Sequence, residues 1–225
     1  MNNIPSEEEM VPRFQTSIPK SGTHLLSHII RTGWFGWQGH KMTRMLTTNG
    51  QQLSFHFSPD YRHVQGHLAY MQDWEAFLIG RVGVFLYRDP RDNLVSWYYY
   101  LDECKENHVL STLNIGLNLK AEKDRMATMI RVLPQFFQGF IPWLDHPKVI
   151  SVRYEDILFK PEEALSTLSV ALKEPLDYLV ERSKLRESRT FRKAQPGNWE
   201  YELHPHHKRA FETTWGDIME KFGYV

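Results

Sequence analysis

The stretch VGVFLYRDPRDNLVSWYYYL, from Val82 to Leu101, holds a complete transition from a strand to a helix. Its first six residues, Val82–Tyr87, are apolar on both faces, as the buried strands of a parallel sheet are. Asp89 and Pro90 then signal a helix start, because aspartate caps exposed amides and proline fits the first turn. The apolar spacing over Asp92–Leu101 predicts an amphipathic helix. This stretch therefore predicts a parallel sheet covered by helices.

The same alternation of short apolar runs and helical spacings extends along the whole chain. A second clear strand is predicted over Val149–Tyr154, and weaker ones over Arg13–Ser17 and His63–His67. Further helices are predicted over Thr23–Arg31, 122–140, 161–172, 176–187 and 206–222. Strands that alternate with helices build a central sheet flanked on both faces. The predicted fold class is α/β, with a parallel sheet of four or five strands.

The amino-acid composition excludes several kinds of partner and location. The chain has 225 residues, and its 27 Lys and Arg balance 27 Asp and Glu, so no long-range field attracts nucleic acid or an anionic membrane. The single cysteine, Cys104, excludes an intramolecular disulfide, and Met1–Met10 lacks the basic and apolar regions of a secretion signal. We expect one domain over 1–225 with residues 1–11 frayed, in the reducing cytoplasm, with neither nucleic acid nor membrane as a partner.

The segment TSIPKSGTHL, from Thr16 to Leu25, runs from a predicted strand through a tight turn into a helix. Amides at such a helix start bind anions, and Gly22 permits a close approach of the backbone. Lys20 adds a full positive charge. An ordinary turn with a surface lysine is the alternative interpretation. The glycine and lysine do not have the Walker A spacing, which disfavours a nucleotide hydrolase that uses Mg²⁺.

Arg88 follows the strand Val82–Tyr87, at the sheet edge where ligands bind in open parallel sheets. Its planar guanidinium suits a phosphate, and Ser96 lies about two helical turns later. A structural ion pair with Asp89 or Asp92 is the alternative role for Arg88. A third segment, FRKAQPGNW over Phe191–Trp199, is by itself only a basic loop.

Read together, these segments resemble the cytosolic-type sulfotransferases that use 3′-phosphoadenosine 5′-phosphosulfate (PAPS), and especially their compact bacterial members. Thr16–Thr23 is similar to the family's 5′-phosphosulfate loop T-Y-P-K-S-G-T-T-W, and Arg88–Ser96 to its 3′-phosphate motif R-x-P-[KR]-D-x-x-x-S. Tyr154–Asp156 resembles its Y-E-D element, and Arg192–Trp199 its R-K-G-x-x-G-D-W motif. The four motifs occur in the family's order, and the resemblance extends from about Arg13 to Val225.

The resemblance implies a P-loop-kinase-like three-layer fold and transfer of a sulfuryl group to a hydroxyl or amine of a small-molecule acceptor, without a metal. It assigns catalytic roles to His67, as the base that takes the acceptor proton, and to Lys20, beside the leaving oxygen. It assigns donor binding to Pro19, Lys20, Ser21, Gly22, Thr23, His24, Leu25, Arg88, Ser96, Tyr154, Ser183, Leu185, Arg192, Lys193 and Ala194.

The sequence departs from the family pattern at several of these positions. Leu25 and Leu185 stand where the family has aromatic residues around the adenine, which forfeits about 1 to 3 kcal/mol of stacking for each. Ala194 replaces a glycine, and Asn198 replaces an aspartate. Gln65 stands where other members carry a lysine that contacts the sulfonate. The family's dimerisation signature is absent from 200–207, so the oligomeric state is left open.

Two other functions remain alternatives. A nucleotide-dependent kinase has the same order of strand, anion-binding loop and helix, but it normally needs a true Walker A motif and Mg²⁺. A non-catalytic nucleotide-binding relative is the second. His204, His206 and His207 suggest a metal cluster, but no cysteine, HExxH motif or second ligand group at a suitable spacing accompanies them. We therefore interpret them as a solvated loop or an acceptor wall.

Overall fold

The structure, a computed structural model, describes residues 11–30, 63–103, 122–176 and 195–225. Most of the predicted helix over 176–187 lies outside these residues, as does nearly all of the segment expected to fray. So do five of the predicted donor-binding residues: Ser183, Leu185, Arg192, Lys193 and Ala194.

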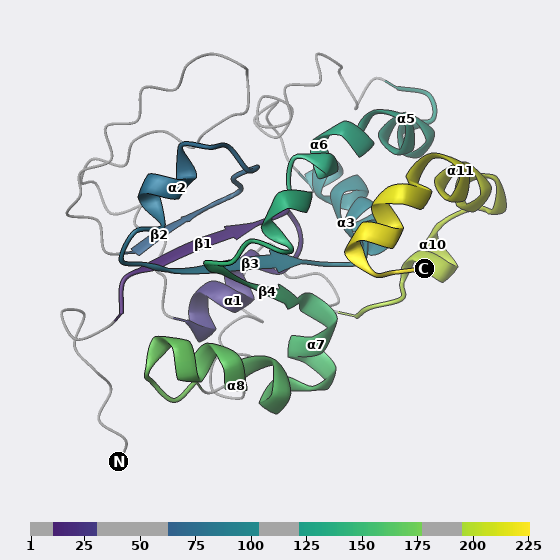
Figure 1. The fold of residues 1–225 in the computed structure, drawn as a ribbon. Coiled ribbons are helices and arrows are strands. Elements are labelled where there is room, and N and C mark those ends of the chain that lie inside the picture. The colour runs from purple at the N-terminus through teal and green to yellow at the C-terminus, as the bar shows by residue number, and fades with distance from the viewer. Residues whose placement is uncertain (1–10, 31–62, 104–121, 177–194) are drawn as a thin grey trace.

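A parallel sheet of four strands forms the centre of the described structure (Figure 1). Its strands are β1 (Arg13–Ser17), β2 (His63–Gly66), β3 (Val82–Tyr87) and β4 (Val149–Arg153). They lie in the order β2-β1-β3-β4, and Thr16 of β1 pairs with Gly66 on one side and Phe85 on the other. The prediction of a parallel α/β sheet with four or five strands is confirmed.

Helices cover both faces of this sheet and give three layers (Figure 1). On one face, Phe85 and Tyr87 pack into a large core with α2 (Trp74–Phe77), α3 (Pro90–Glu103), α5 (Arg125–Val132), α6 (Pro134–Gln138), the 3₁₀ turn η2 (Ile141–Trp143) and α11 (Pro205–Phe222). On the other, Val84 and Leu86 pack against α1 (Thr23–Ile29), α7 (Tyr154–Phe159) and α8 (Pro161–Leu172). Alternate residues of β3 thus enter opposite cores, which explains its unbroken apolar sequence.

Several predicted boundaries were wrong. The helix predicted over 122–140 is two helices, α5 and α6, because Pro134 has no amide hydrogen to continue the first. The strand expected to end at Tyr154 ends at Arg153, where α7 begins, and the strand expected to reach His67 ends at Gly66. The short α2, α7, η2 and α10 (Trp199–Glu202) were not predicted, since each has too few residues for a periodic signal.

The strand order reverses between β1 and β3. The chain leaves β1 toward β2 on one side and later returns to place β3 on the other side of β1. In open parallel sheets ligands bind in the crevice at such a switch point, outside the carboxyl ends of the strands. The segments that follow β1 and β3 are the two that the sequence singled out as anion-binding.

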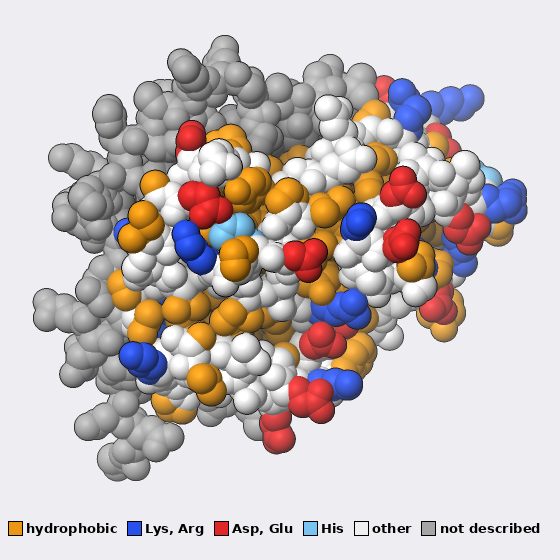
Figure 2. Space-filling model, viewed as in Figure 1, with side chains coloured by type: hydrophobic (Ala, Val, Ile, Leu, Met, Phe, Trp, Pro, Cys, Tyr) orange, Lys and Arg blue, Asp and Glu red, His pale blue; other side chains and the backbone are white. Residues whose placement is uncertain are grey.

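Acidic and basic side chains are interspersed on the face of the molecule that Figure 2 shows. This agrees with the formal net charge of zero. No helix in the described parts of the chain is long and apolar enough to span a bilayer.

Candidate active site

Predicted site residues follow the carboxyl ends of all four strands. Pro19–Thr23 follows β1, His67 follows β2, Arg88 follows β3 and Tyr154 follows β4. Parallel strands end at the same edge of a sheet, so the fold gathers residues that are far apart in the sequence.

The loop after β1 has a backbone suited to an anion. Lys20 and Gly22 both have positive φ values, 68° and 92°, on either side of Ser21. The Ser21 amide donates to the Ile18 carbonyl oxygen at 3.2 Å and closes the turn, so the amides suited to an anion are those at the start of α1. Gly22 is also the N-cap of α1, and it has no side chain to cap the first amides of the helix.

Tyr154 fixes the position of this loop. A Cβ atom at Gly22 would lie 2.5 Å from the Tyr154 ring, so the ring occupies the space that any larger residue would need. The same ring lies 4.8 Å from the Arg88 guanidinium. The tyrosine after β4 therefore contacts both of the segments predicted to hold the donor.

Helix α3 holds the loop from its other side. The Asn93 amide donates hydrogen bonds to the Pro19 carbonyl oxygen at 2.8 Å and to Ser21 Oγ at 3.0 Å, and the Trp97 indole donates to the same carbonyl at 3.2 Å. The Lys20 ammonium lies 3.9 Å from the centre of the Tyr100 ring. Ser96 is three residues after Asn93 and four before Tyr100, so it shares their helix face.

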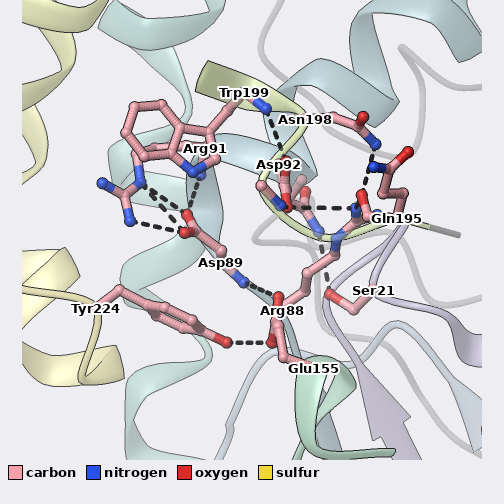
Figure 3. Close-up of polar contacts among 12 residues, drawn as sticks. Ser21, Arg88, Asp89, Arg91, Asp92, Glu155, Gln195, Asn198, Trp199 and Tyr224 are labelled. Atoms are coloured by element: carbon pink, nitrogen blue, oxygen red, sulfur yellow. Dashed lines mark hydrogen bonds and ion pairs between the residues drawn. The ribbon is translucent and has the colours of Figure 1, made fainter. Parts of the chain in front are cut away.

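Arg88 is buried, with a side-chain exposure of 10%. Its Nη2 lies 3.5 Å from Asp92 Oδ2 and donates to the Gln195 carbonyl oxygen at 3.4 Å (Figure 3). The ion-pair role that the sequence left open for Arg88 is thus present. Its buried Nε, however, has no hydrogen-bond partner within the described structure. A buried guanidinium N–H without a partner is costly, so a ligand that accepts from it would be bound strongly.

Asp92 organises the described end of the third predicted segment. Its carboxylate accepts hydrogen bonds from the Gly197 amide at 2.6 Å and the Trp199 amide at 3.0 Å (Figure 3). Burial raises the pKa of Asp92, and the Arg88 charge and these two amides oppose the shift. From the sequence, Asp92 was predicted only as a helix residue and a partner for Arg88. Its place in the R-x-P-[KR]-D motif was the available signal.

Glu155 and Tyr224 form a second support, which was not predicted from the sequence. Glu155 Oε1 accepts from the Asp89 amide at 3.1 Å, and Oε2 accepts from the Tyr224 hydroxyl at 2.6 Å (Figure 3). Burial raises the pKa of Glu155, while the Tyr224 hydrogen bond lowers it. Asp89 in turn binds the Arg91 side chain at 2.7 Å. The carboxyl terminus of the chain is thereby attached beside Arg88.

His67 is held by Ser17, the last residue of β1. Its Nδ1 lies 3.1 Å from the Ser17 carbonyl oxygen and 3.1 Å from Ser17 Oγ. A carbonyl oxygen only accepts, so the geometry favours the tautomer with hydrogen on Nδ1 and a lone pair on Nε2. Burial lowers the pKa of His67 to about 4; the hydrogen bond to Ser17 opposes this, and the His24 and Lys20 charges add to it.

Hydroxyl and amide side chains connect His67 to the anion loop. Ser17 Oγ lies 2.7 Å from Thr23 Oγ1, so Ser17 contacts both the histidine and the first helical residue of the loop. Gln65 Oε1 accepts from Ser27 Oγ at 2.5 Å, which connects the end of β2 to α1. Burial also lowers the pKa of His24, helped by Lys20 and His28.

No family model and no curated protein matches this chain. Among solved structures, mouse sulfotransferase SULT7A1 complexed with PAP is similar with a TM-score of 0.61 and 17% identity, over 94% of this chain and 88% of that one. Retinol dehydratase in complex with androsterone and inactive cofactor PAP has a TM-score of 0.51 and 19% identity, over 72% of this chain and 54% of that one.

These similarities establish the fold of the chain. It has the P-loop-like α/β fold of the cytosolic-type sulfotransferases, as the sequence motifs implied. SULT7A1 shares this fold over most of both chains.

Proposed function

We propose that this protein is a PAPS-dependent sulfotransferase that acts on a hydroxyl or amine of a small molecule. The observation that carries the proposal is the pairing of two anion sites at the switch point of the sheet. One is the turn at Lys20–Gly22 that leads into α1, and the other is Arg88, whose buried Nε has no hydrogen-bond partner among the described residues. Both are spanned by one aromatic residue, Tyr154. PAPS carries anionic groups at both ends of its ribose, and the two solved neighbours above bear PAP.

The residues fit such a donor. The amides at the start of α1 and the Lys20 ammonium would hold the 5′-phosphosulfate, because preorganised amides and a full charge stabilise a bound oxyanion. Arg88 and Ser96 would hold the 3′-phosphate. Gln195, in the described part of the third segment, accepts a hydrogen bond from Arg88. Arg192, Lys193 and Ala194 lie outside the described residues, and they are proposed to bind the same phosphate on the resemblance alone.

The bound donor would supply an activated sulfuryl group, and the protein would supply the charges around it. Negative charge develops on the leaving oxygen as the S–O bond breaks, and Lys20 would stabilise it there. Thr23 and its partner Ser17 would orient the loop at this point. Ser183 and Leu185 are proposed to contact the nucleotide on its far side, on the resemblance alone.

His67 would take the acceptor proton at Nε2. Its Nδ1–H is held by Ser17, which leaves Nε2 as the atom that can accept. A group with a pKa of about 4 is neutral at physiological pH but is a weak base. An anionic donor bound beside it would raise that pKa, because a negative charge favours the imidazolium. The base would therefore strengthen when the donor is present.

The structure also bears on the two alternatives. A kinase would place Mg²⁺ between carboxylates and the phosphates. In the described part of the site, Asp92 and Glu155 are instead used by backbone amides and a tyrosine hydroxyl. A non-catalytic relative needs no oriented base, whereas His67 is fixed through Ser17. Both observations favour the transferase.

The test compares ligands by their effect on the melting temperature. Adenosine 3′,5′-bisphosphate should raise it far more than ATP or 5′-AMP, since only the bisphosphate has a 3′-phosphate for Arg88. Arg88→Lys keeps the charge but loses the planar fork, and should weaken bisphosphate binding by about tenfold or more. Arg131→Ala, an exposed arginine on α5, is the matched control.

Equal stabilisation by ATP and the bisphosphate would refute the donor assignment. If the bisphosphate binds but labelled PAPS transfers no sulfate to any acceptor in a broad screen of phenols, alcohols and amines, the non-catalytic alternative is correct. Androsterone, a ligand in the retinol dehydratase complex, is a suitable first acceptor in that screen.

A further inference from the structure

Three side chains meet where the start of α11 packs beside the start of α5 (Figure 1). Asp124 is the N-cap of α5, and His206 and His207 lie in the first turn of α11. His207 Nε2 lies 3.1 Å from each Asp124 carboxylate oxygen, and His206 Nε2 lies 3.6 Å from Oδ2. The sequence interpretation found no second ligand group near these histidines; the tertiary structure corrects this by supplying Asp124 from 82 residues earlier than His206.

The spacing of these atoms matches a small tetrahedral cation. Zn²⁺ binds nitrogen and oxygen at about 2.0 to 2.2 Å, so two of its ligands lie about 3.3 to 3.6 Å apart. Ligand atoms of all three residues lie within 4.8 Å of one another. The two imidazole rings are only 4.0 Å apart between centroids, and both direct Nε2 toward the same carboxylate.

We infer that Asp124, His206 and His207 form a binding site for Zn²⁺ or a similar divalent transition metal. Two imidazoles and one carboxylate suit Zn²⁺, Co²⁺, Ni²⁺ or Cu²⁺, whereas Mg²⁺ and Ca²⁺ prefer sets made of oxygen alone. Binding would use the lone pair of each Nε2, so the hydrogen on that nitrogen would move to Nδ1 of a neutral ring or, from an imidazolium, to water.

The surroundings suit such a site. The Ala127 amide donates to Asp124 Oδ1 at 3.0 Å and lowers the pKa of Asp124, so the carboxylate is ionised and oriented without the metal. His207 has 8% side-chain exposure and provides an anchored ligand, while Asp124 at 47% and His206 at 58% leave a path from solvent. A third imidazole, His204, has its ring 5.7 Å from that of His206.

Metal at this position would join the start of α5 to the start of α11. The histidines follow α10, whose first residue, Trp199, donates its amide hydrogen to Asp92. The site does not include the anion loop or Arg88. The inference therefore stands apart from the proposed sulfotransferase activity, and each can fail without the other.

Isothermal titration of the full chain, purified without a polyhistidine tag, with ZnCl₂ tests the inference. We expect one site, the visible absorption of tetrahedral Co²⁺ when CoCl₂ is used instead, and no binding of MgCl₂. Zinc at 100 times its Kd should raise the melting temperature by about 5 to 10 °C, through preferential binding to the folded chain.

Two variants test the ligands. Asp124→Asn retains a good helix cap and His206→Gln alters an exposed side chain, so both should fold. Each should weaken zinc binding at least about tenfold, in line with losses seen even for outer partners of metal ligands. Asp217→Asn and His28→Gln are matched controls at exposed positions. Absence of zinc binding, equal binding by Mg²⁺, or variants that bind like the controls would overturn the assignment.

Discussion

His67 gives the sharpest prediction about the physical state of the site. An imidazole normally titrates near 6.5, and burial beside His24 and Lys20 lowers the pKa of His67 to about 4. The unfolded chain therefore binds a proton at this residue between pH 6.5 and 4 that the folded chain does not bind. Stability must rise with pH across that window and be lost as pH falls through it. The difference between the ordinary pKa of a histidine and the pKa of His67 in the folded chain corresponds to about 3 kcal/mol of unfolding free energy at most.

The assay is denaturant unfolding at pH 7.5 and pH 5.0 for the wild type and for His67→Asn. When the pH falls from 7.5 to 5.0, His67 alone should lower the unfolding free energy of the wild type by about 2 kcal/mol, because this change covers most of the interval between pH 6.5 and 4. Comparison with the variant removes the contribution of every other titrating group. His28→Asn, an exposed histidine on α1, should behave as the wild type does.

If the wild type and His67→Asn lose the same stability between the two pH values, His67 is not held neutral, and the assignment of Nε2 as a ready proton acceptor fails. Kinetics add an independent check. The acid limb of kcat/KM, which reports the free enzyme, should lie near pH 4, and the limb of kcat should lie higher once the anionic donor is bound.

Four further outcomes are expected. Lys20→Met should lower kcat by about 10² to 10³ fold with little change in bisphosphate affinity, because its charge acts on the leaving oxygen; a normal kcat with raised KM would limit Lys20 to binding. His67→Ala should lower kcat by about 10² to 10⁴ fold while bisphosphate still raises the melting temperature, and retained activity would move the base to His24 or His63. Gly22→Ala should cost more than about 1 kcal/mol of stability and abolish donor binding, since φ is 92° and the Tyr154 ring fills the space; unchanged calorimetric binding would contradict this. Sulfate transfer should persist in excess EDTA, because Lys20 and the loop amides supply the charge that Mg²⁺ supplies in kinases, and a divalent-metal requirement would favour the kinase alternative.

The sequence by itself determined the class of fold and the chemistry of the loops. Strand β3 was predicted with its observed bounds, because apolar residues buried on both faces form an unbroken run. The bounds of β1 were also as predicted, although its sequence RFQTS is mostly polar and gave the weaker signal. The turn over Pro19–Thr23 and the helix start after Arg88 could be predicted because proline, glycine and aspartate act locally on the backbone. These signals depend on near neighbours in the chain, so they need no knowledge of the folded molecule.

Only the tertiary structure decided which residues meet. Tyr154 contacts Gly22 from 132 residues away, Asp92 binds the amides of 197 and 199, and Ser17 lies within hydrogen-bond distance of His67 Nδ1. The pKa of His67 likewise depends on how deeply the sheet edge is covered, which no local pattern records. Such contacts form across a sheet whose strands are ordered by topology, and burial is a property of the whole packed chain. Composition and residue spacing therefore identified the side chains of the candidate site. Tertiary packing decided which partners those side chains contact and how burial shifts their pKa values.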